Sequence, residues 1–326
     1  MSTNRNILLV AKKLGLHDWQ VENTIRLMDG GATIPFISRY RKEMTGSLDE
    51  VQLLHIKEEY DRLKELDARK EAVIKSIEEQ EKMTPELRQK IDAAVTMSEL
   101  EDIYLPYRPK RRTRATIARE KGLEPLAVLI MDQKEIDPVL EAEGFLNDDV
   151  ATVEDALAGA SDIMAEWVNE DEKARKQLRY LFEKEAVIYS KIVKGKEAEG
   201  IKFSDYYDWS EPLKKCPSHR LLAMRRGEDE GFLRLSVEPD EKHALEILNS
   251  IFIKGRNASS DVVSDAVKDS WKRLLSSSME TEFRNISKEK ADDEAIKVFA
   301  ENLRQLLLAS PLGEKNVLAI DPGYRT

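Results

Sequence analysis

A long run of apolar residues at helical spacing constrains the fold of this sequence more than any other feature. Between residues 51 and 77, large apolar side chains recur at close to the helical period, with charged residues between them. This period stacks the apolar side chains on one face of an α-helix. Ser47 followed by Glu50 has the spacing of a capping box, a common helix start. The run therefore predicts one helix of about 30 residues that ends near Gln80. Its apolar positions are Val51, Leu54, Tyr60, Leu63, Leu66, Val73, Ile74 and Ile77.

Further helix-start signals predict that most of the remaining chain is also helical. Glycine is scarce, at 14 residues, and 35% of the residues are charged, a composition that favours helices. Residues 232–237 alternate in polarity and predict the one clear strand before the C-terminal region. The helix starts are Thr33 before Pro35, Thr84 before Pro85, Thr96 with Glu99, and Thr152 with Asp155. We expect further helices over residues 113–121, 152–184 with a break near 169, 218–227, 240–253, 260–283 and 287–309.

The composition also excludes several classes of protein. A single cysteine, Cys216, excludes a disulfide framework and a zinc cluster, and it favours a reducing compartment. No apolar run approaches the roughly 18 residues of a membrane span, so a cytoplasmic protein with no membrane partner is expected. The four histidines are scattered, and there is no glycine-rich phosphate loop, so no metal or other cofactor is predicted. The tryptophans, including Trp19, are expected at helix interfaces.

Positive charge is concentrated in one segment, residues 108–121, which we call the basic island. The chain as a whole has a formal net charge of -10, so this concentration needs an explanation. Pro106 and Pro109 interrupt helix formation, which places the start of the island on a loop. Its later part is expected on a short helix that Gly122 ends. The cations are Arg108, Lys110, Arg111, Arg112, Arg114, Arg119 and Lys121, with Glu120 among them.

Three explanations of the basic island remain open from the sequence. Its arginines can contact the phosphates of RNA or DNA, since the planar guanidinium grips phosphate with two hydrogen bonds. Alternatively, the island clamps neighbouring acidic helices together, in a protein with 62 acidic residues. It can also bind a protein partner. Tyr104 and Tyr107 are near enough in sequence to stack on a base, although Tyr104 is better placed for the hydrophobic core.

A second basic cluster lies within residues 35–42, PFISRYRK. Arg39, Arg41 and Lys42 are candidates for the same phosphate-binding surface. Helical geometry places Phe36 and Tyr40 on one face and Ile37 on another. The alternative is an ordinary amphipathic helix whose arginines are solvated or form salt bridges. A phosphate-binding surface that combines both clusters requires that Arg39 or Arg41 adjoin the basic island.

Several long segments of the sequence resemble the N-terminal part of the Tex family of bacterial transcription accessory proteins. They include GATIPFISRYRKEMTGSLDE, LEDIYLPYRPKRRTRATIAREKGLEPL and VLAIDPGYRT, and the resemblance extends over almost the whole chain. It implies a mainly α fold, an elongated multi-helix assembly with a helix-turn-helix-like element and one small β element. It also implies that the last residues begin a YqgF-type, RNase H-like α/β domain. We therefore expect a fragment of a longer protein.

With the polar stretch 194–200 as a boundary, this resemblance suggests three parts. Residues 1–195 are the Tex-type helical domain, residues 196–313 a central helical region with the β element, and residues 314–326 the truncated RNase H-like start. Residues 317–320 have the pattern of a buried strand. In RNase H-like folds a first-strand carboxylate binds a catalytic metal, which points to Asp321. Cleavage needs several converging acids, so Asp321 alone forms an incomplete site, and an Asp-Pro-Gly turn is the simpler explanation.

The leading hypothesis is a non-enzymatic, nucleic-acid-associated transcription accessory module. It would bind RNA or DNA through backbone phosphates without sequence readout. One alternative is a protein-interaction scaffold that docks on the transcription machinery. Another is part of a metal-dependent nuclease in the complete protein. The sequence leaves the oligomeric state open.

Overall fold

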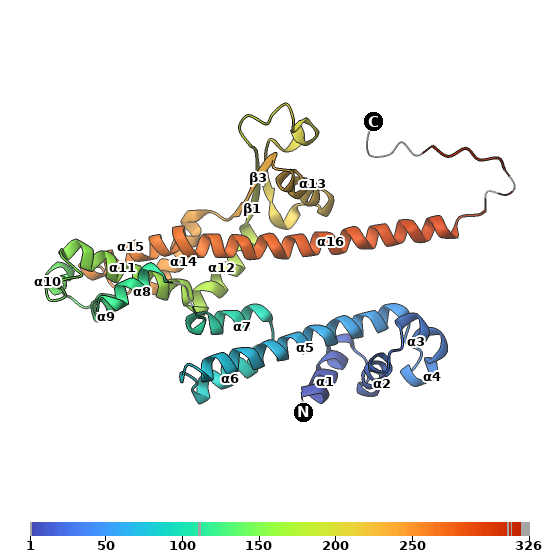
Figure 1. Ribbon diagram of the computed structural model, residues 1–326, viewed down its shortest axis with the longest axis horizontal. Helices are drawn as coiled ribbons and strands as arrows, with labels where there is room; N and C mark the ends of the chain where they lie inside the picture. Colours follow the sequence, from blue (N-terminus) through green and yellow to red (C-terminus); the bar gives the residue numbers. More distant parts are fainter. Residues whose placement is uncertain (1, 110–111, 312, 314, 321–326) are drawn as a thin grey trace. The chain divides into compact units, whose positions relative to one another are not determined.

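The computed structural model describes residues 2–109, 112–311, 313 and 315–320. The chain divides into two compact units, residues 1–113 and 114–326 (Figure 1). Within the described residues, helices dominate both units, and unit 2 also contains a small antiparallel sheet. The mainly α fold predicted from the sequence is confirmed.

Unit 1 is organised around one long helix, α5 (Figure 1). The helices α1 to α3 pack against its first half, and α6 and α7 pack against its second half. A separate hydrophobic cluster forms on each half, one around Leu53 and Ile56 and the other around Val73 and Ile77. The elements are α1 (Ser2–Leu14), α2 (Asp18–Asp29), α3 (Ile34–Tyr40), α4 (Lys42–Thr45), α5 (Glu50–Glu78), α6 (Pro85–Ala93), α7 (Met97–Tyr104) and η1 (Leu105–Tyr107).

The long helix that the sequence predicted is present, and α5 has 29 residues. Its capping box is formed by Asp49 and Gln52, whereas Ser47 adopts a left-handed backbone with φ of 63°. The buried face also differs from the prediction in its first turns. Leu53 is fully buried, whereas Val51 is 59% exposed and Leu54 42% exposed. Both sets of positions have helical spacing, and the packing of α1 to α3 decides which set is covered.

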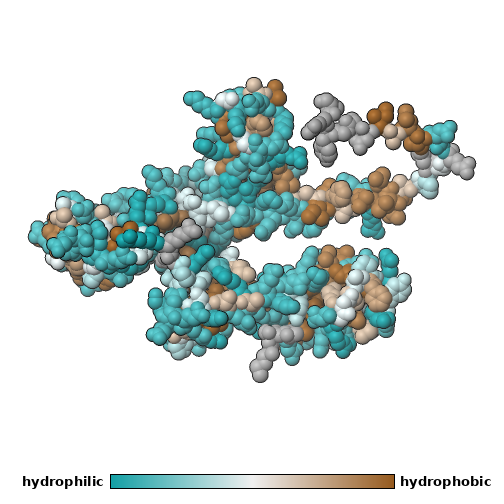
Figure 2. All heavy atoms as spheres, viewed as in Figure 1, coloured by the Kyte–Doolittle hydropathy of each residue, from teal (hydrophilic) through white to brown (hydrophobic). Residues whose placement is uncertain are grey.

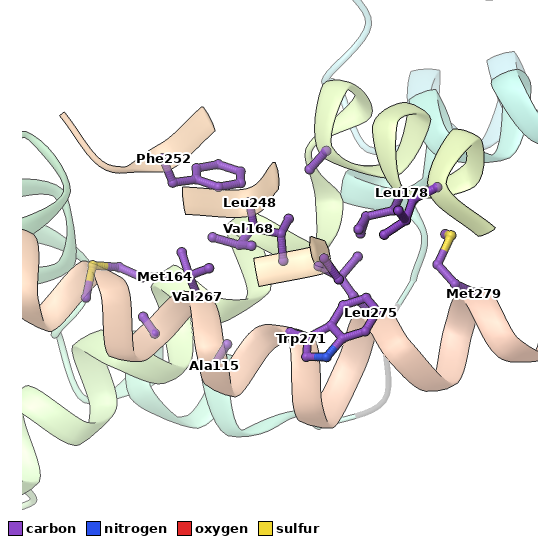
Figure 3. Close-up of a cluster of buried hydrophobic side chains, with 14 of the residues drawn as sticks. Ala115, Met164, Val168, Leu178, Leu248, Phe252, Val267, Trp271, Leu275 and Met279 are labelled. Carbon is purple, nitrogen blue, oxygen red and sulfur yellow. The ribbon is translucent and has the colours of Figure 1, made fainter. Parts of the chain in front are cut away.

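Unit 2 contains the remaining elements. A hydrophobic core joins its helices to the sheet, and Figure 3 shows part of this core, with Trp271 and Leu275 beside Val168 and Leu178. The elements are α8 (Arg114–Glu120), α9 (Glu124–Met131), α10 (Pro138–Glu143), α11 (Val153–Glu170), α12 (Glu172–Glu185), β1 (Val187–Ile192), η2 (Ile201–Tyr206), β2 (Asp208–Pro212), η3 (Leu213–Lys215), α13 (Ser218–Asp229), β3 (Leu233–Glu238), α14 (Glu241–Phe252), α15 (Ala258–Ser270), η4 (Trp271–Leu275) and α16 (Ser276–Leu308).

The sheet has the strand order β2-β1-β3, and both pairings are antiparallel. The sequence predicted β3, whose alternation matches one buried and one exposed face. It did not predict β1 and β2, in whose sequences polar and apolar residues alternate less clearly. The polar stretch 194–200, suggested as a domain boundary, connects β1 to η2 and β2, so both of its sides belong to unit 2.

The C-terminal helices form a longer continuous run than the sequence suggested. A turn of π-helix, η4, joins α15 to α16, and α16 continues through residues 283–287, where a break was expected. The second half of α16 carries exposed apolar residues, including Phe299 at 68% and Leu307 at 74% (Figure 2). Residues 317–320, expected as a strand, have no assigned secondary structure and are exposed. A strand needs a hydrogen-bonded neighbour, and no described strand pairs with this segment.

Candidate nucleic-acid interface

The α3–α4 corner of unit 1 contains the second basic cluster. Pro35 lies in the first turn of α3, where its missing N–H costs no hydrogen bond. Ile37 and Ser38 face α5, and the Ser38 hydroxyl donates to Glu50 Oε1 at 3.0 Å. This attachment turns the opposite face of α3 outward, so that Arg39 and Tyr40 are exposed.

In the part of the chain that the structure describes, no carboxylate pairs with the three cations of this corner. Arg39 and Lys42 are exposed, and neither makes a side-chain hydrogen bond or ion pair with any residue that the structure describes. The Arg41 guanidinium lies over the Phe36 ring, with Cζ 5.2 Å from the ring centroid. Its Nη1 donates to the main-chain oxygen of Tyr40 at 3.0 Å. The corner therefore presents positive charge to solvent rather than salt bridges.

The loop part of the basic island ends unit 1. Tyr104 is buried, and its hydroxyl lies 2.9 Å from Ser76 Oγ, so it belongs to the core rather than to a base-stacking surface. Gln80 Nε2 donates to the main-chain oxygen of Tyr107 at 2.8 Å, which ties the loop to the end of α5. Arg108 is exposed and has no side-chain partner among the described residues. Arg112 is also exposed, but it is not without a partner. Lys110 and Arg111 lie outside the described residues.

The helical part of the island, on α8 of unit 2, faces acids of α11. Arg119 donates to Glu166 Oε2 at 2.6 Å and to Glu124 Oε1 at 3.2 Å. Burial by itself lowers the pKa of Arg119. The hydrogen bonds and charges of Glu166 and Glu124 together have the larger effect, so the pKa lies above its ordinary value. Arg114 is exposed. Arg119 thus has the geometry of the internal clamp.

Close packing between α8 and α11 supports this clamp. Asp162 is part of the same contact. Burial raises its pKa, and the charges of Arg273 and Arg114 oppose that rise. Gly159 of α11 lies where a Cβ atom would be 2.3 Å from Leu123 Cδ1 and 3.3 Å from Ala118 Cβ. The absence of a side chain at Gly159 therefore lets the two helices approach closely enough for the Arg119 bond.

Within unit 1, the α3–α4 corner and the loop that leads into Arg108 are held at different places along α5. The α3–α4 corner is held at the start of α5 through Glu50, whereas the loop before Arg108 is held near its end through Ser76 and Gln80. At a rise of 1.5 Å per residue, these anchor points are about 40 Å apart along α5. The length of α5 is the physical reason for the separation.

Sequence reasoning missed the exposure of the aromatic residues at this corner. Tyr40 is 63% exposed and Phe36 is 40% exposed. Trp19, expected in a helix interface, is 47% exposed although its ring contacts Gly46 at the end of α4. The available signal was the i, i+4 spacing of Phe36 and Tyr40 beside three cations. Ile37 and Ser38 occupy the buried face of the same helix.

Among the described residues, no three histidine, cysteine or acidic side chains are placed to hold a metal ion. Asp321 lies outside the described residues. None of the helices in the described part of the chain is both long and apolar enough to cross a bilayer.

Burial, together with a hydrogen bond to Glu211, raises the pKa of the Cys216 thiol to about 12.

Comparison with known proteins gives matches along most of the chain. Residues 133–299 match the Tex central region-like family model, and residues 4–78 match the model of the Tex-like protein N-terminal domain. The chain is 44% identical over 323 residues to transcriptional accessory protein Tex of Neisseria gonorrhoeae, covering 97% of this chain and 43% of that protein. It is 42% identical over 339 residues to protein tex of Bordetella pertussis, covering 99% and 43%.

A more distant relative is human S1 RNA-binding domain-containing protein 1. It is 28% identical over 338 residues, which cover 98% of this chain and 34% of that protein. The chain spans less than half the length of these curated relatives. The matches to both Tex family models, together with the 42–44% identity to bacterial Tex proteins, show that this chain belongs to the Tex family.

Proposed function

We propose that this chain is a nucleic-acid-associated transcription accessory module that binds RNA or DNA through backbone phosphates. The observation that carries the proposal is a set of exposed cations, Arg39, Lys42 and Arg108, in a protein of net charge -10. None of the three has a carboxylate partner among the described residues. An acidic protein is repelled by a polyanion except at such positions. The names of the relatives point to the same class, since one is a transcriptional accessory protein and another contains an RNA-binding domain.

We further propose that the module acts by binding and not by catalysis. Arginine and lysine bind phosphate, and the candidate residues include no nucleophile or general base. Phosphate contacts position a nucleic acid without reading its bases, so little dependence on sequence is expected. A bacterial protein of this kind would work in the cytoplasm. A metal-dependent nuclease site that includes Asp321 would need further acidic residues from the complete protein.

Fluorescence anisotropy across a salt series tests this proposal. A variant with Arg39→Ala, Lys42→Ala and Arg108→Ala removes three candidate contacts. A control with Lys57→Ala, Lys134→Ala and Lys268→Ala makes the same charge change at exposed lysines elsewhere, whose side chains are 53%, 74% and 56% exposed. The slope of log K against log salt should become shallower by about one unit per lost contact in the first variant and stay unchanged in the control. Equal slopes, or no binding at low salt, would contradict the proposal.

A second candidate function is a protein-interaction scaffold, and the exposed apolar residues of α16 favour it. Ile296, Phe299 and Leu306 are 65%, 68% and 73% exposed. Apolar patches of this kind mark interaction surfaces. Replacing Phe299 and Leu306 with Ser should abolish association with an RNA polymerase preparation in sedimentation velocity, if α16 supplies the contact. Unchanged association would remove this candidate.

A further inference from the structure

The exposed aromatic rings of the α3–α4 corner have no role in simple phosphate binding. We propose that Phe36 and Tyr40, with the Arg41 guanidinium, form a stacking platform for the unpaired bases of single-stranded nucleic acid. This inference rests on the proposed function and names its ligand class: a single strand rather than a duplex. We call Phe36, Tyr40 and Arg41 the stacking platform.

The packing of α3 holds the rings on the outer surface. Ile37 is fully buried and Ser38 is hydrogen-bonded to Glu50, so the buried face of the helix is fixed. Phe36 and Tyr40 are four residues apart and therefore share another face. Their ring centroids are 5.4 Å apart and their planes are tilted by 45°, so the two rings form neighbouring aromatic faces of different inclination.

Arg41 adds a planar cation to this surface. Its guanidinium lies over the Phe36 ring, and its hydrogen bond to the Tyr40 oxygen restricts its position. Nucleic-acid bases stack on aromatic rings and on arginine planes, and this stacking tolerates any base because every base has a π face. The platform thus has the chemical groups that single-strand binding uses.

The charges around the platform favour a polyanion as its occupant. Residues 34–45 contain three cations, Arg39, Arg41 and Lys42, and one acid, Glu43. Arg39 and Lys42 have no side-chain partner among the described residues. Lysine is depleted in protein–protein interfaces, whereas this corner exposes Lys42 next to Arg41, whose guanidinium lies over the Phe36 ring. Unpaired cations beside aromatic rings match the backbone and the bases of a single strand.

A third exposed ring belongs to the same corner. Hydrogen bonds from Gln20 and Asn23 to main-chain oxygens at the end of α4 hold α4 against α2. The Trp19 ring lies against Gly46, where a Cβ atom would be 2.8 Å from ring atom Cη2. Gly46 has φ of 69°, a conformation that glycine adopts without strain. Trp19 is therefore held at the surface, available to a strand that extends beyond the platform.

The direct test is anisotropy of the 326-residue chain with a labelled oligo(A) RNA and a labelled DNA duplex, each of about 12 nucleotides or base pairs. The test variant carries Phe36→Leu and Tyr40→Leu, which keep apolar bulk but remove the π faces. It should bind oligo(A) about 25-fold or more weakly, since each of the two lost stacks weakens binding about 5-fold or more. Its salt slope should stay that of the wild-type chain, because no phosphate contact is lost.

Two further arms separate the possible failures. A variant with Phe36→Tyr and Tyr40→Phe keeps both π faces and should bind oligo(A) as the wild-type chain does. Because both rings are exposed, circular dichroism should show that all variants fold. If the Leu variant binds oligo(A) unchanged, or if the duplex binds as tightly as the single strand, the platform inference is overturned while the proposed function stands.

The remaining outcomes point elsewhere. If no nucleic acid binds at low salt, the proposed function fails together with the platform. If a poly-glutamate peptide displaces oligo(A) and binds the Leu variant as well as the wild-type chain, the corner is an acidic-protein docking surface, and the platform inference is overturned.

Discussion

Arg119 of α8 and Glu166 of α11 are joined by a hydrogen-bonded ion pair, with Nη1 2.6 Å from Oε2. The Glu166 side chain is only 8% exposed, whereas that of Arg119 is 28% exposed. The carboxylate is thus largely removed from water and depends on its partners. One segment of concentrated positive charge therefore contains residues with different roles: Arg119 stabilises helix packing, and Arg108 remains available at the surface.

Replacing Arg119 with Ala should lower the free energy of unfolding by about 2 kcal/mol, because hydrogen bonds to charged groups are worth about this much. The lost partner leaves Glu166 with fewer bonds to offset its burial. Urea unfolding followed by circular dichroism measures the change. Lys134→Ala, which breaks an exposed ion pair with Asp132, is the control and should change stability by about 0.5 kcal/mol or less. Weaker RNA binding by Arg119→Ala with unchanged stability would show that Arg119 contacts phosphate instead.

The buried face of α5 can be tested at two adjacent leucines. Leu53→Ala should cost about 2–5 kcal/mol, since Leu53 is fully buried and its truncation leaves a cavity. Leu54→Ala should cost about 1 kcal/mol or less, because Leu54 is 42% exposed. Both changes remove the same atoms from the same helix, so helix propensity cancels in the comparison. Equal costs in chemical denaturation would mean that the helix buries a different face.

Cys216 should react slowly with iodoacetamide. Burial and the neighbouring Glu211 raise the pKa of its thiol from 9.0 to about 12, so the thiolate is scarce at mildly alkaline pH. Since the thiolate is the reactive form, the rate should be about 1,000-fold below that of a free thiol. Alkylation followed by mass spectrometry measures it, and unfolding in urea should restore the ordinary rate. A native rate equal to the denatured one would contradict this environment for Cys216.

His243 should make a contribution to stability that depends on pH. Its Nδ1 lies 2.8 Å from Glu185 Oε2, and this hydrogen bond raises the pKa of His243 above 6.5. Below pH 6.5 both the folded and the unfolded chain carry the proton, and the pair contributes fully. As the pH rises through the raised folded pKa, the folded state loses the proton and the contribution disappears.

His243→Gln should therefore lower the melting temperature more in mildly acidic than in mildly alkaline buffer. Differential scanning calorimetry at both pH values measures the difference. Lys268→Ala should show no such dependence. It breaks an exposed ion pair between Lys268 and Asp265, both on α15. A deficit that is the same at both pH values would mean that the His243 side chain acts through packing alone.

Local patterns in the sequence were sufficient for most helix positions. Threonine caps at Thr84, Thr96 and Thr152 accept the expected main-chain hydrogen bonds. The length of α5 also follows from its apolar period. These features depend on residues that are close in the chain, so a sequence pattern contains the necessary information. The capping box of α5 was misplaced because Ser47 and Asp49 both satisfy the pattern, and only the backbone geometry distinguishes them.

Tertiary structure decided which residues of each pattern face solvent. Leu53 and Leu54 both fit a helical stripe, and the packing of α1 to α3 selects Leu53 for the core. Arg108 and Arg119 belong to one basic segment, yet only Arg119 meets a buried carboxylate, 47 residues away in sequence. The exposure of Phe36 and Tyr40 follows from the attachment of Ser38 to α5. Burial and ion pairing depend on contacts between distant segments, so the sequence by itself determined the helices, and their packing determined which side chains remain available for binding.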